Sequence, residues 1–335
     1  MENFTPTKFD VVVIGSGLAG LSAADDLCRA GFKTLILDKG RGPGGRLAGR
    51  RIAEASFDFG AQFFTARSAC FKTCVDQWVQ AGVAEEWYRS YPGQPDGHPR
   101  YRGVPSMTAI AKHMAKGKNL HQSTRVENVG QSQTGWRVSV DQGKIFDAKA
   151  LLITCPVPQT LELLATSKIS LPTIMQNRLQ RIKYEPCIAV MAVLDGPSAV
   201  LPPGALSVDD GCIAWVSDNQ QKRVSKIPAV TIHASAEYSA KNFDRNRQQV
   251  GGELIELARP LIGDANIVDF QVHGWRYSKP MTTDKSESLL ITEATDLPPI
   301  AVAGDAFAGP RFEGAVVSGW SAARQLLAAL GNHCP

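Results

Sequence analysis

Three glycines and one aspartate near the start of the chain have the types and spacing of a dinucleotide-binding site. Gly15, Gly17 and Gly20 form a G-x-G-x-x-G pattern, and Asp38 follows. In such a pattern the first glycine makes a tight turn, the second lets main chain approach a pyrophosphate, and the third lets a helix pack on a strand. The later acidic side chain accepts hydrogen bonds from ribose hydroxyls. We therefore expect a dinucleotide to contact Gly15, Ser16, Gly17, Leu18, Ala19, Gly20 and Asp38.

The elements that must hold these residues are a strand, a helix and a second strand in direct succession. Residues 11–14 are an apolar, β-branched run that predicts a buried parallel strand. A helix over residues 21–30 follows and ends at Gly31, and residues 34–37 form a second strand that ends in Asp38. This order fits a βαβ unit of roughly thirty residues.

A second glycine-rich turn favours FAD over NAD as the dinucleotide. It follows Asp38 directly and contains Lys39, Gly45 and Arg46. A site for NAD alone does not need this turn, whereas a larger dinucleotide does, because glycines permit close approach and an arginine counters phosphate charge. The basic residues around it are equally consistent with a solvated surface. We expect Lys39, Gly45 and Arg46 to contact FAD.

These motifs together resemble the extended glycine signature of the FAD-containing amine oxidase superfamily, in which a G-G-R turn follows the acid. Asp38 stands where that superfamily more often has Glu, and the shorter carboxylate can still accept the ribose bonds. Residues 57–67 resemble the renalase-like branch, where an acid, G-A-Q, two aromatics and T-A-R come after the G-G-R turn. The resemblance implies flavin contacts from Gly60, Ala61, Gln62 and Phe63, and an adenine contact from the strand that holds Val126.

The C-terminal part of the chain returns to the cofactor. Gly304 and Asp305 end a short apolar strand, and a glycine-containing loop then leads into a helix over residues 315–330. Asp305 can hold ribitol or another hydroxyl of the cofactor, and the helix start at Gly314, Ala315 and Val316 offers amide donors and the positive end of a helix dipole. In amine oxidases with a covalent flavin a cysteine lies in this segment. Residues 305–315 contain none, so we expect noncovalent FAD.

The predicted fold class is α/β, with an FAD-binding, Rossmann-like doubly wound domain and a substrate lobe of mostly antiparallel sheet and helices. A chain of 335 residues is long for one core. Strand-like runs separated by turns, with one helix over residues 244–258, predict the lobe. We expect residues 1–70, 100–165 and 270–335 to form the FAD-binding domain, and residues 71–99 and 166–269 the substrate lobe.

Composition excludes several other classes of protein. The chain is 44% hydrophobic and 20% charged and has no apolar run long enough to span a bilayer, so we expect no membrane partner. The first eight residues lack an apolar signal region, which predicts a cytoplasmic protein. A net charge of +4 is too small to indicate nucleic-acid binding. The seven cysteines show no paired spacing typical of a metal site.

The resemblance to renalase-like enzymes implies a particular oxidase reaction. Such an enzyme takes a hydride from dihydropyridine isomers of NAD(P)H, the 2- or 6-dihydro forms, and gives NAD(P)+, with H2O2 made when O2 reoxidises the flavin. The dihydropyridine nitrogen itself drives the hydride out, so the protein need only orient the ring and exclude water. The sequence shows no Ser-His-Asp spacing and no paired catalytic carboxylates, as this reaction allows. The candidate residues for the substrate face are Gln62, His233, Trp275, Tyr277 and Arg311.

Each substrate-face candidate also has a plain structural interpretation. His233 could be a satisfied core histidine, Trp275 and Tyr277 could be core residues on one face of a strand, and Arg311 could pair with Glu313. Three other functions stay open. They are an oxidase of small amines with an aromatic cage, a flavoprotein whose FAD is not turned over, and, more distantly, an NAD-only dehydrogenase.

Overall fold

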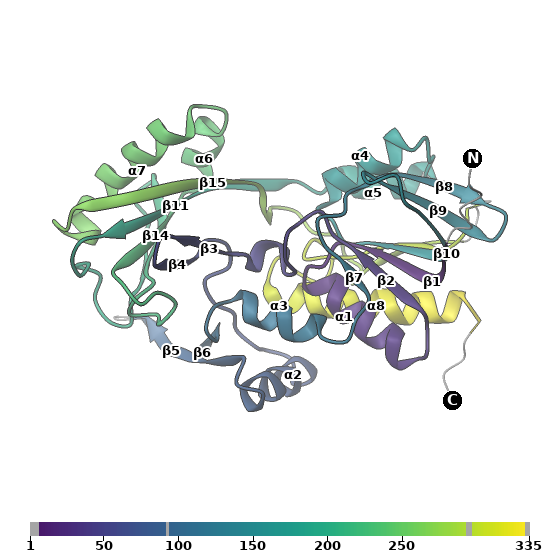
Figure 1. The fold of residues 1–335 in the computed structure, drawn as a ribbon, viewed down its shortest axis with the longest axis horizontal. Helices are drawn as coiled ribbons and strands as arrows, with labels where there is room; N and C mark the ends of the chain where they lie inside the picture. Colours follow the sequence, from purple (N-terminus) through teal and green to yellow (C-terminus); the bar gives the residue numbers. More distant parts are fainter. Residues whose placement is uncertain (1–6, 92–93, 293–296, 332–335) are drawn as a thin grey trace. The chain divides into compact units, whose positions relative to one another are not determined.

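The computed structural model describes residues 7–91, 94–292 and 297–331, which divide into two compact units (Figure 1). Unit 1 comprises the described parts of Met1–Gly45, Ala111–Lys183 and Pro280–Pro335, and unit 2 comprises Arg46–Ile110 and Tyr184–Lys279. The sequence-based domains are named for what they would bind, FAD and the substrate, whereas the two units are distinguished by their compactness. The assignment of FAD and substrate to them stays a prediction. Residues 46–70 and 100–110, placed by that prediction in the FAD domain, belong to unit 2.

Unit 1 contains an eight-stranded mixed sheet with a parallel centre. The strand order is β16-β17-β10-β1-β2-β7, and the hairpin of β8 and β9 joins through β10. Strands β17, β10, β1, β2 and β7 pair in parallel, and β16 closes one edge antiparallel. The bounds are β1 Thr7–Ile14, β2 Thr34–Leu37, β7 Leu120–His121, β8 Val126–Ser132, β9 Gly135–Val140, β10 Ile145–Ile153, β16 Leu289–Ile291 and β17 Ile300–Val302. The Rossmann-like sheet predicted from the glycine motif is confirmed.

Helices α1 (Leu18–Arg29) and α8 (Phe312–Ala329) cover one face of this sheet (Figure 1). The Ser22 hydroxyl donates to the Val316 carbonyl at 3.1 Å near the start of both helices, and the charge of Arg324 acts on Asp26 further along. The two helices therefore run in the same direction. Helix α8 begins three residues before the predicted start at residue 315. Two more helices of unit 1 are α4 (Val157–Thr166) and α5 (Thr173–Gln180), and α3 (Thr108–Ala115) crosses the boundary between the units.

Unit 2 is built on a five-stranded sheet with the order β12-β13-β14-β11-β15. The pairs among β12, β13, β14 and β11 are antiparallel, as predicted for this part of the chain. The bounds are β11 Tyr184–Leu194, β12 Ala205–Ser207, β13 Ile213–Asp218, β14 Ala229–Ala234 and β15 Ile267–Pro280. Its other elements are the hairpins β3 (Gly49–Ile52) with β4 (Ala55–Asp58) and β5 (Ala84–Tyr91) with β6 (Gln94–Gly103), and the helices α2 (Ala69–Gln80), α6 (Ala236–Asn242) and α7 (Arg247–Ile262).

Strand β11, which lies between β14 and β15, is buried on both faces over most of its length. Its successive side chains point to opposite sides of the sheet. Val190 packs in a cluster with Leu254 of α7, and Met191 packs in a second cluster with Phe57 of β4. Helix α7 thus covers one face of the sheet, and the β3–β4 hairpin covers the other. The contact between Met191 and Phe57 places the end of β4 against the five-stranded sheet of unit 2.

Helix α7 starts and ends later than the sequence predicts. The predicted range was 244–258, whereas the helix runs from Arg247 to Ile262. The start shifts because the Asn246 side chain accepts hydrogen bonds from the amides of Gln248 and Gln249, which makes Asn246 the N-cap. In the described part of the chain, no helix is long and apolar enough to cross a membrane.

Candidate functional site

The turn between β1 and α1 has the backbone that a dinucleotide needs. Gly15 has a φ of +108°, and a Cβ on Gly20 would lie 2.0 Å from the Gly15 carbonyl oxygen, so the fold itself requires both glycines. A Cβ on Gly17 would meet none of the described atoms within 4 Å. The second glycine therefore borders open space, where a ligand can approach the main chain.

The second glycine-rich turn lies against the first within unit 1. The Gly44 amide donates to the Ser16 carbonyl at 2.8 Å, and Gly45, with a φ of +54°, lies close to Gly17. Lys39 is exposed at the start of this turn. The predicted cofactor residues on either side of β2 are thus brought together.

Asp38 lies at the end of β2 and bonds back to the first turn. Its Oδ2 atom accepts hydrogen bonds from the amide and the hydroxyl of Ser16, both at 2.6 Å, and its Oδ1 atom accepts from the Gly40 amide at 2.6 Å. A carboxylate has about four acceptor positions, so capacity for a ribose hydroxyl remains. The Asp38 carbonyl accepts from the Thr124 amide at 2.8 Å, two residues before Val126 starts β8.

Two helix N-termini follow the carboxyl ends of parallel strands in unit 1. Helix α1 follows β1, and α8 follows β17 by way of Gly304 and the buried Asp305. Within the described residues, neither N-cap, Gly17 or Arg311, has a side-chain cap bond. The amide donors and the positive end of the dipole at a helix N-terminus suit a phosphate or another electron-rich group. The start of α8 contains Gly314, Ala315 and Val316, with Gly314 and Val316 buried.

These features of unit 1 fit a bound dinucleotide. The required glycines, the open main chain at Gly17 and the acid after β2 are what an adenosine pyrophosphate would contact. Arg311, predicted for the substrate face, lies exposed at the N-cap of α8.

In unit 2, the turn at residues 58–61 begins at the last residue of β4 and is held by side chains from several elements. The Asp58 carbonyl accepts from Gln62 Nε2 at 2.7 Å and from the Thr231 hydroxyl at 3.0 Å. The Gly60 carbonyl accepts from Gln62 Nε2 at 3.1 Å. A Cβ on Gly60 would lie 2.0 Å from the Arg46 carbonyl, which also accepts from the Ala61 amide at 2.9 Å. Gly60 is therefore required by close main-chain contact.

Two predicted substrate-face residues meet at the same carbonyl of this turn. The Phe59 carbonyl binds His233 Nε2 at 3.1 Å and accepts from Trp275 Nε1 at 2.9 Å. The Trp275 ring also stacks on Phe59 with a centroid distance of 5.1 Å. Tyr277, two residues along β15, packs instead against Tyr184 at 5.7 Å. The structure thus gathers His233 and Trp275 at one carbonyl, while the Tyr277 ring contacts Tyr184.

His233 is neutral at physiological pH. Burial, together with the nearby charge of Lys222, lowers the pKa of His233 to about 4, against the opposing effect of its bond to the Phe59 carbonyl. Because a carbonyl only accepts, the neutral ring must carry its proton on Nε2. His233 therefore donates to the turn in its neutral form.

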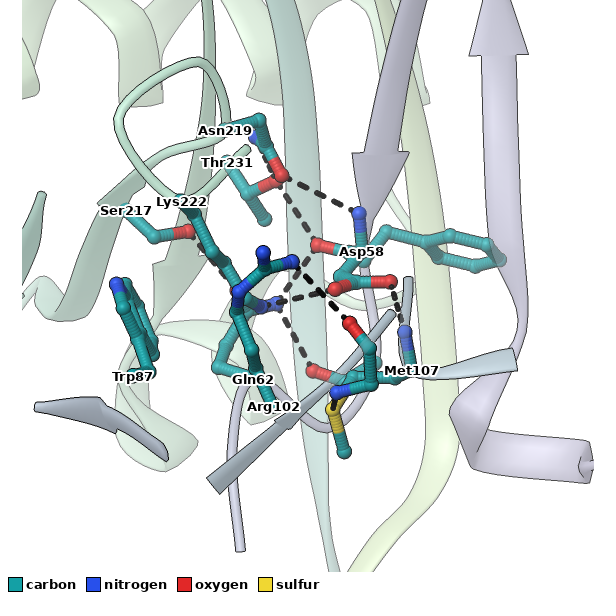
Figure 2. A network of polar contacts seen from close by, with 12 residues as sticks. Asp58, Gln62, Trp87, Arg102, Met107, Ser217, Asn219, Lys222 and Thr231 are labelled. Carbon is teal, nitrogen blue, oxygen red and sulfur yellow. Dashed lines mark hydrogen bonds and ion pairs between the residues drawn. The ribbon is translucent and has the colours of Figure 1, made fainter. Parts of the chain in front are cut away.

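Gln62 is engaged at both ends of its amide (Figure 2). Its Nε2 atom donates to the turn, and its Oε1 atom accepts from the Ser217 hydroxyl at 2.9 Å and from Lys222 Nζ at 3.3 Å. Lys222 forms an ion pair with Asp58 Oδ2 at 2.9 Å. Phe63, the next residue, packs against Trp215 with ring centroids 5.5 Å apart.

Sequence reasoning missed the charged residues at the centre of this network, Asp58 and Lys222. Lys222 lies in a polar run that is typical of a solvated loop. Asp58 did offer a signal, because a carboxylate between two phenylalanines at the end of an apolar strand needs a partner. The other polar residues of the network that the sequence analysis did not single out are Arg102, Ser217, Asn219 and Thr231.

Comparison with known proteins assigns the class of this chain. Residues 83–327 match the model of the flavin containing amine oxidoreductase family, and residues 13–78 match an NAD(P)-binding Rossmann-like domain. The first match covers more than half of the chain. The chain therefore belongs to the flavin-containing amine oxidoreductase family, an oxidoreductase family whose members use a flavin, and a flavin fits the dinucleotide-binding features of unit 1.

Similarity to individual proteins is local in sequence and extensive in fold. The chain is 40% identical over 63 residues to the inactive all-trans-retinol 13,14-reductase of Danio rerio, and 36% identical over 63 residues to Protein FLOWERING LOCUS D of Arabidopsis thaliana. These alignments cover 19% and 18% of this chain but only 10% and 8% of the relatives. A putrescine oxidase bound to putrescine has a similar fold, with a TM-score of 0.72, 15% identity, and coverage of 97% of this chain and 100% of that chain.

Proposed function

We propose that this protein is a renalase-like oxidase with noncovalent FAD. Its substrate would be a dihydropyridine isomer of NAD(P)H, reduced at ring position 2 or 6. The reaction would convert the isomer, O2 and one proton into NAD(P)+ and H2O2. Bound FAD would supply the hydride acceptor and, on reoxidation, the route to O2.

The observation that carries this proposal is the state of the polar side chains around the 58–61 turn. His233 is neutral and donates to the Phe59 carbonyl, and Gln62 is bonded at both ends. Because the hydrogen bonds of His233 and Gln62 are directed to other protein groups, these side chains can orient a site but are poor acceptors of a proton from the substrate. A dihydropyridine needs no proton removed, because its ring nitrogen drives the hydride out. The residues present therefore suit orientation of a flat ring and exclusion of water.

We propose that FAD contacts the first turn, Asp38 and the start of α8. The resemblance to renalase-like enzymes adds Gly60, Ala61, Gln62 and Phe63 to the proposed flavin contacts. Cys155 lies beside the first turn, where its thiol is 3.9 Å from the Ile14 carbonyl. Burial raises the pKa of Cys155 to about 11, so its thiol is protonated and a weak nucleophile. This supports noncovalent FAD.

The alternative function is oxidation of a small amine. Family membership favours it, as does the fold shared with a putrescine oxidase. Unit 2 also contains a cluster of aromatic rings in which Phe63 contacts Tyr88 at 6.2 Å and Trp215 at 5.5 Å. Such rings could form a cage for a neutral amine.

The two functions are separated by anaerobic reduction of the purified holoprotein. The protein is mixed with 2-dihydro- or 6-dihydro-NAD, with ordinary NADH and with a panel of amines that includes putrescine, and flavin absorbance is followed. Rapid bleaching by an isomer alone supports the proposal. Bleaching by amines alone transfers the function to the alternative, and the absence of bleaching by all of them contradicts both.

A further inference from the structure

Lys222 is a completely buried charge whose role the family match does not assign. Its side chain is 0% exposed, and that of Asp58, 2.9 Å away, is 1% exposed. The Lys222 ammonium also lies 4.9 Å from the centre of the Trp87 ring. Burial lowers the pKa of Lys222, and the Asp58 carboxylate opposes that change. A charge in such a place persists only because it is paired.

The ion pair joins three separate segments of unit 2 (Figure 2). Asp58 ends β4, and its Oδ1 atom accepts from the Met107 amide at 3.0 Å, just before α3. The Asp58 amide donates to the Asn219 side chain at 3.3 Å, and Asn219 and Lys222 belong to the loop after β13. Every polar group of Asp58, main chain and side chain, is thus used to fix the start of the 58–61 turn.

Lys222 acts on Gln62 as well as on Asp58. An ammonium can only donate, so Lys222 requires the Oε1 atom of Gln62 on its side. The Nε2 atom must then face the carbonyls of Asp58 and Gly60. One buried charge therefore sets both the turn and the orientation of the Gln62 amide.

Stability alone does not explain an ion pair at this position. Replacing a buried ion pair with well-packed hydrophobic side chains of similar volume is often neutral or stabilising, whereas removing one partner is costly. The two residues of this pair also bond to Gln62, Met107, Asn219 and Thr231, which suits them to holding the 58–61 turn in place. Groups that contact a cofactor must be held rigidly by their neighbours.

We propose that Lys222 and Asp58 are positioning residues, whose buried ion pair fixes the 58–61 turn and Gln62 for hydride transfer. This rests on the proposed function in one respect, because that function places the turn beside the flavin. Neither residue exchanges a proton with the substrate in this account.

The test compares Lys222→Met, Asp58→Asn and the double variant, each as FAD-loaded holoprotein. Lys226→Met is the matched control, because Lys226 is an exposed lysine in the same loop. Lys222→Met leaves the Asp58 carboxylate buried without its cation and lowers the melting temperature. The double variant removes both charges and regains thermal stability even if the single variant fails to fold.

If Lys222 and Asp58 position the turn, the double variant should reduce its flavin more slowly than the wild type even though its thermal stability is restored. A displacement of the turn by about 1 Å would slow flavin reduction by about 100-fold. The visible circular dichroism of the oxidised flavin should also differ from that of the wild type, whereas Lys226→Met should match the wild type in both. A double variant with the reduction rate and flavin spectrum of the wild type would overturn the proposal.

The flavin spectrum keeps this test separate from the proposed function. If no nicotinamide isomer reduces the wild-type flavin, the proposed function fails, yet the spectra of wild type and double variant can still be compared. Reoxidation by O2 after reduction with dithionite provides a rate that needs no substrate. An altered spectrum and rate in the double variant support positioning, and unchanged values refute it.

Discussion

Replacing Asp38 with alanine tests the cofactor site of unit 1 most sharply. The Asp38 carboxylate holds the Ser16 amide and hydroxyl and the Gly40 amide, all at 2.6 Å. Asp38→Ala removes the acceptor for these donors and, in our account, the acceptor for a ribose hydroxyl. FAD affinity should therefore fall, and the β1–α1 turn should loosen.

The size of the expected loss of FAD affinity follows from the number of hydrogen bonds to the ligand that the substitution removes. One hydrogen bond to a charged acceptor contributes about 1.5–3 kcal/mol. Since about 1.4 kcal/mol corresponds to a tenfold change in affinity, the dissociation constant of FAD should rise about 10-fold to 100-fold. Ser16 is fully buried, so its amide and hydroxyl would lose their acceptor away from water, and protein stability should fall by about 1–3 kcal/mol for each of these donors.

The assay is FAD titration of the apoprotein, followed by quenching of flavin fluorescence. Asp10→Ala is the matched control, because Asp10 also accepts from a main-chain amide, that of Lys33 at 2.8 Å, and also lies in unit 1. The control should lose stability without losing FAD affinity. Equal FAD affinity in Asp38→Ala and wild type, or an equal loss in both variants, would refute the assignment of Asp38.

Three further predictions concern close packing and charge. Gly20→Ala should prevent FAD loading because its Cβ would lie 2.0 Å from a carbonyl oxygen, whereas Gly42→Ala, with open space around it, should give a yellow protein. Gly319→Ala would place a Cβ 2.1 Å from a hydroxyl of α1, and its unfolding free energy in urea should fall by about 1–3 kcal/mol. The folded-state pKa of His233, about 4, lies below its ordinary value of 6.5, so the unfolded chain binds the proton more readily. The stability linked to His233 should thus be complete above pH 6.5 and be lost as pH falls towards 4, and His233→Gln should flatten that dependence in urea unfolding.

The fold of unit 1 was predictable because its signals are local. The glycine spacing, the apolar run at residues 11–14 and the acid at Asp38 all act within one βαβ unit, and the structure confirms that unit. The start of α8 was less predictable. Residues 312–314 precede the apolar pattern of the helix, and Gly314 is tolerated in its first turn because close contact with the Gly309 carbonyl requires a glycine there.

The charged centre of unit 2 was not predictable because its partners are distant in sequence. Asp58 and Lys222 are separated in the sequence by the β5–β6 hairpin, by β7 to β10 of unit 1 and by β11 to β13, and only the folding of unit 2 brings them together. Without that contact, Lys222 has the pattern of a surface lysine. The gathering of His233 and Trp275 at one carbonyl also depends on strand pairing, and their roles towards the substrate stay a prediction.

The most direct test of the central claim is an anaerobic titration of the FAD-loaded protein with 6-dihydro-NAD, followed by admission of air. We expect one equivalent of the isomer to bleach one equivalent of flavin and yield one equivalent of NAD+, with one equivalent of H2O2 formed when O2 restores the colour. A flavin that stays oxidised with this isomer and with its 2-dihydro counterpart, but is bleached by an amine such as putrescine, would contradict the claim.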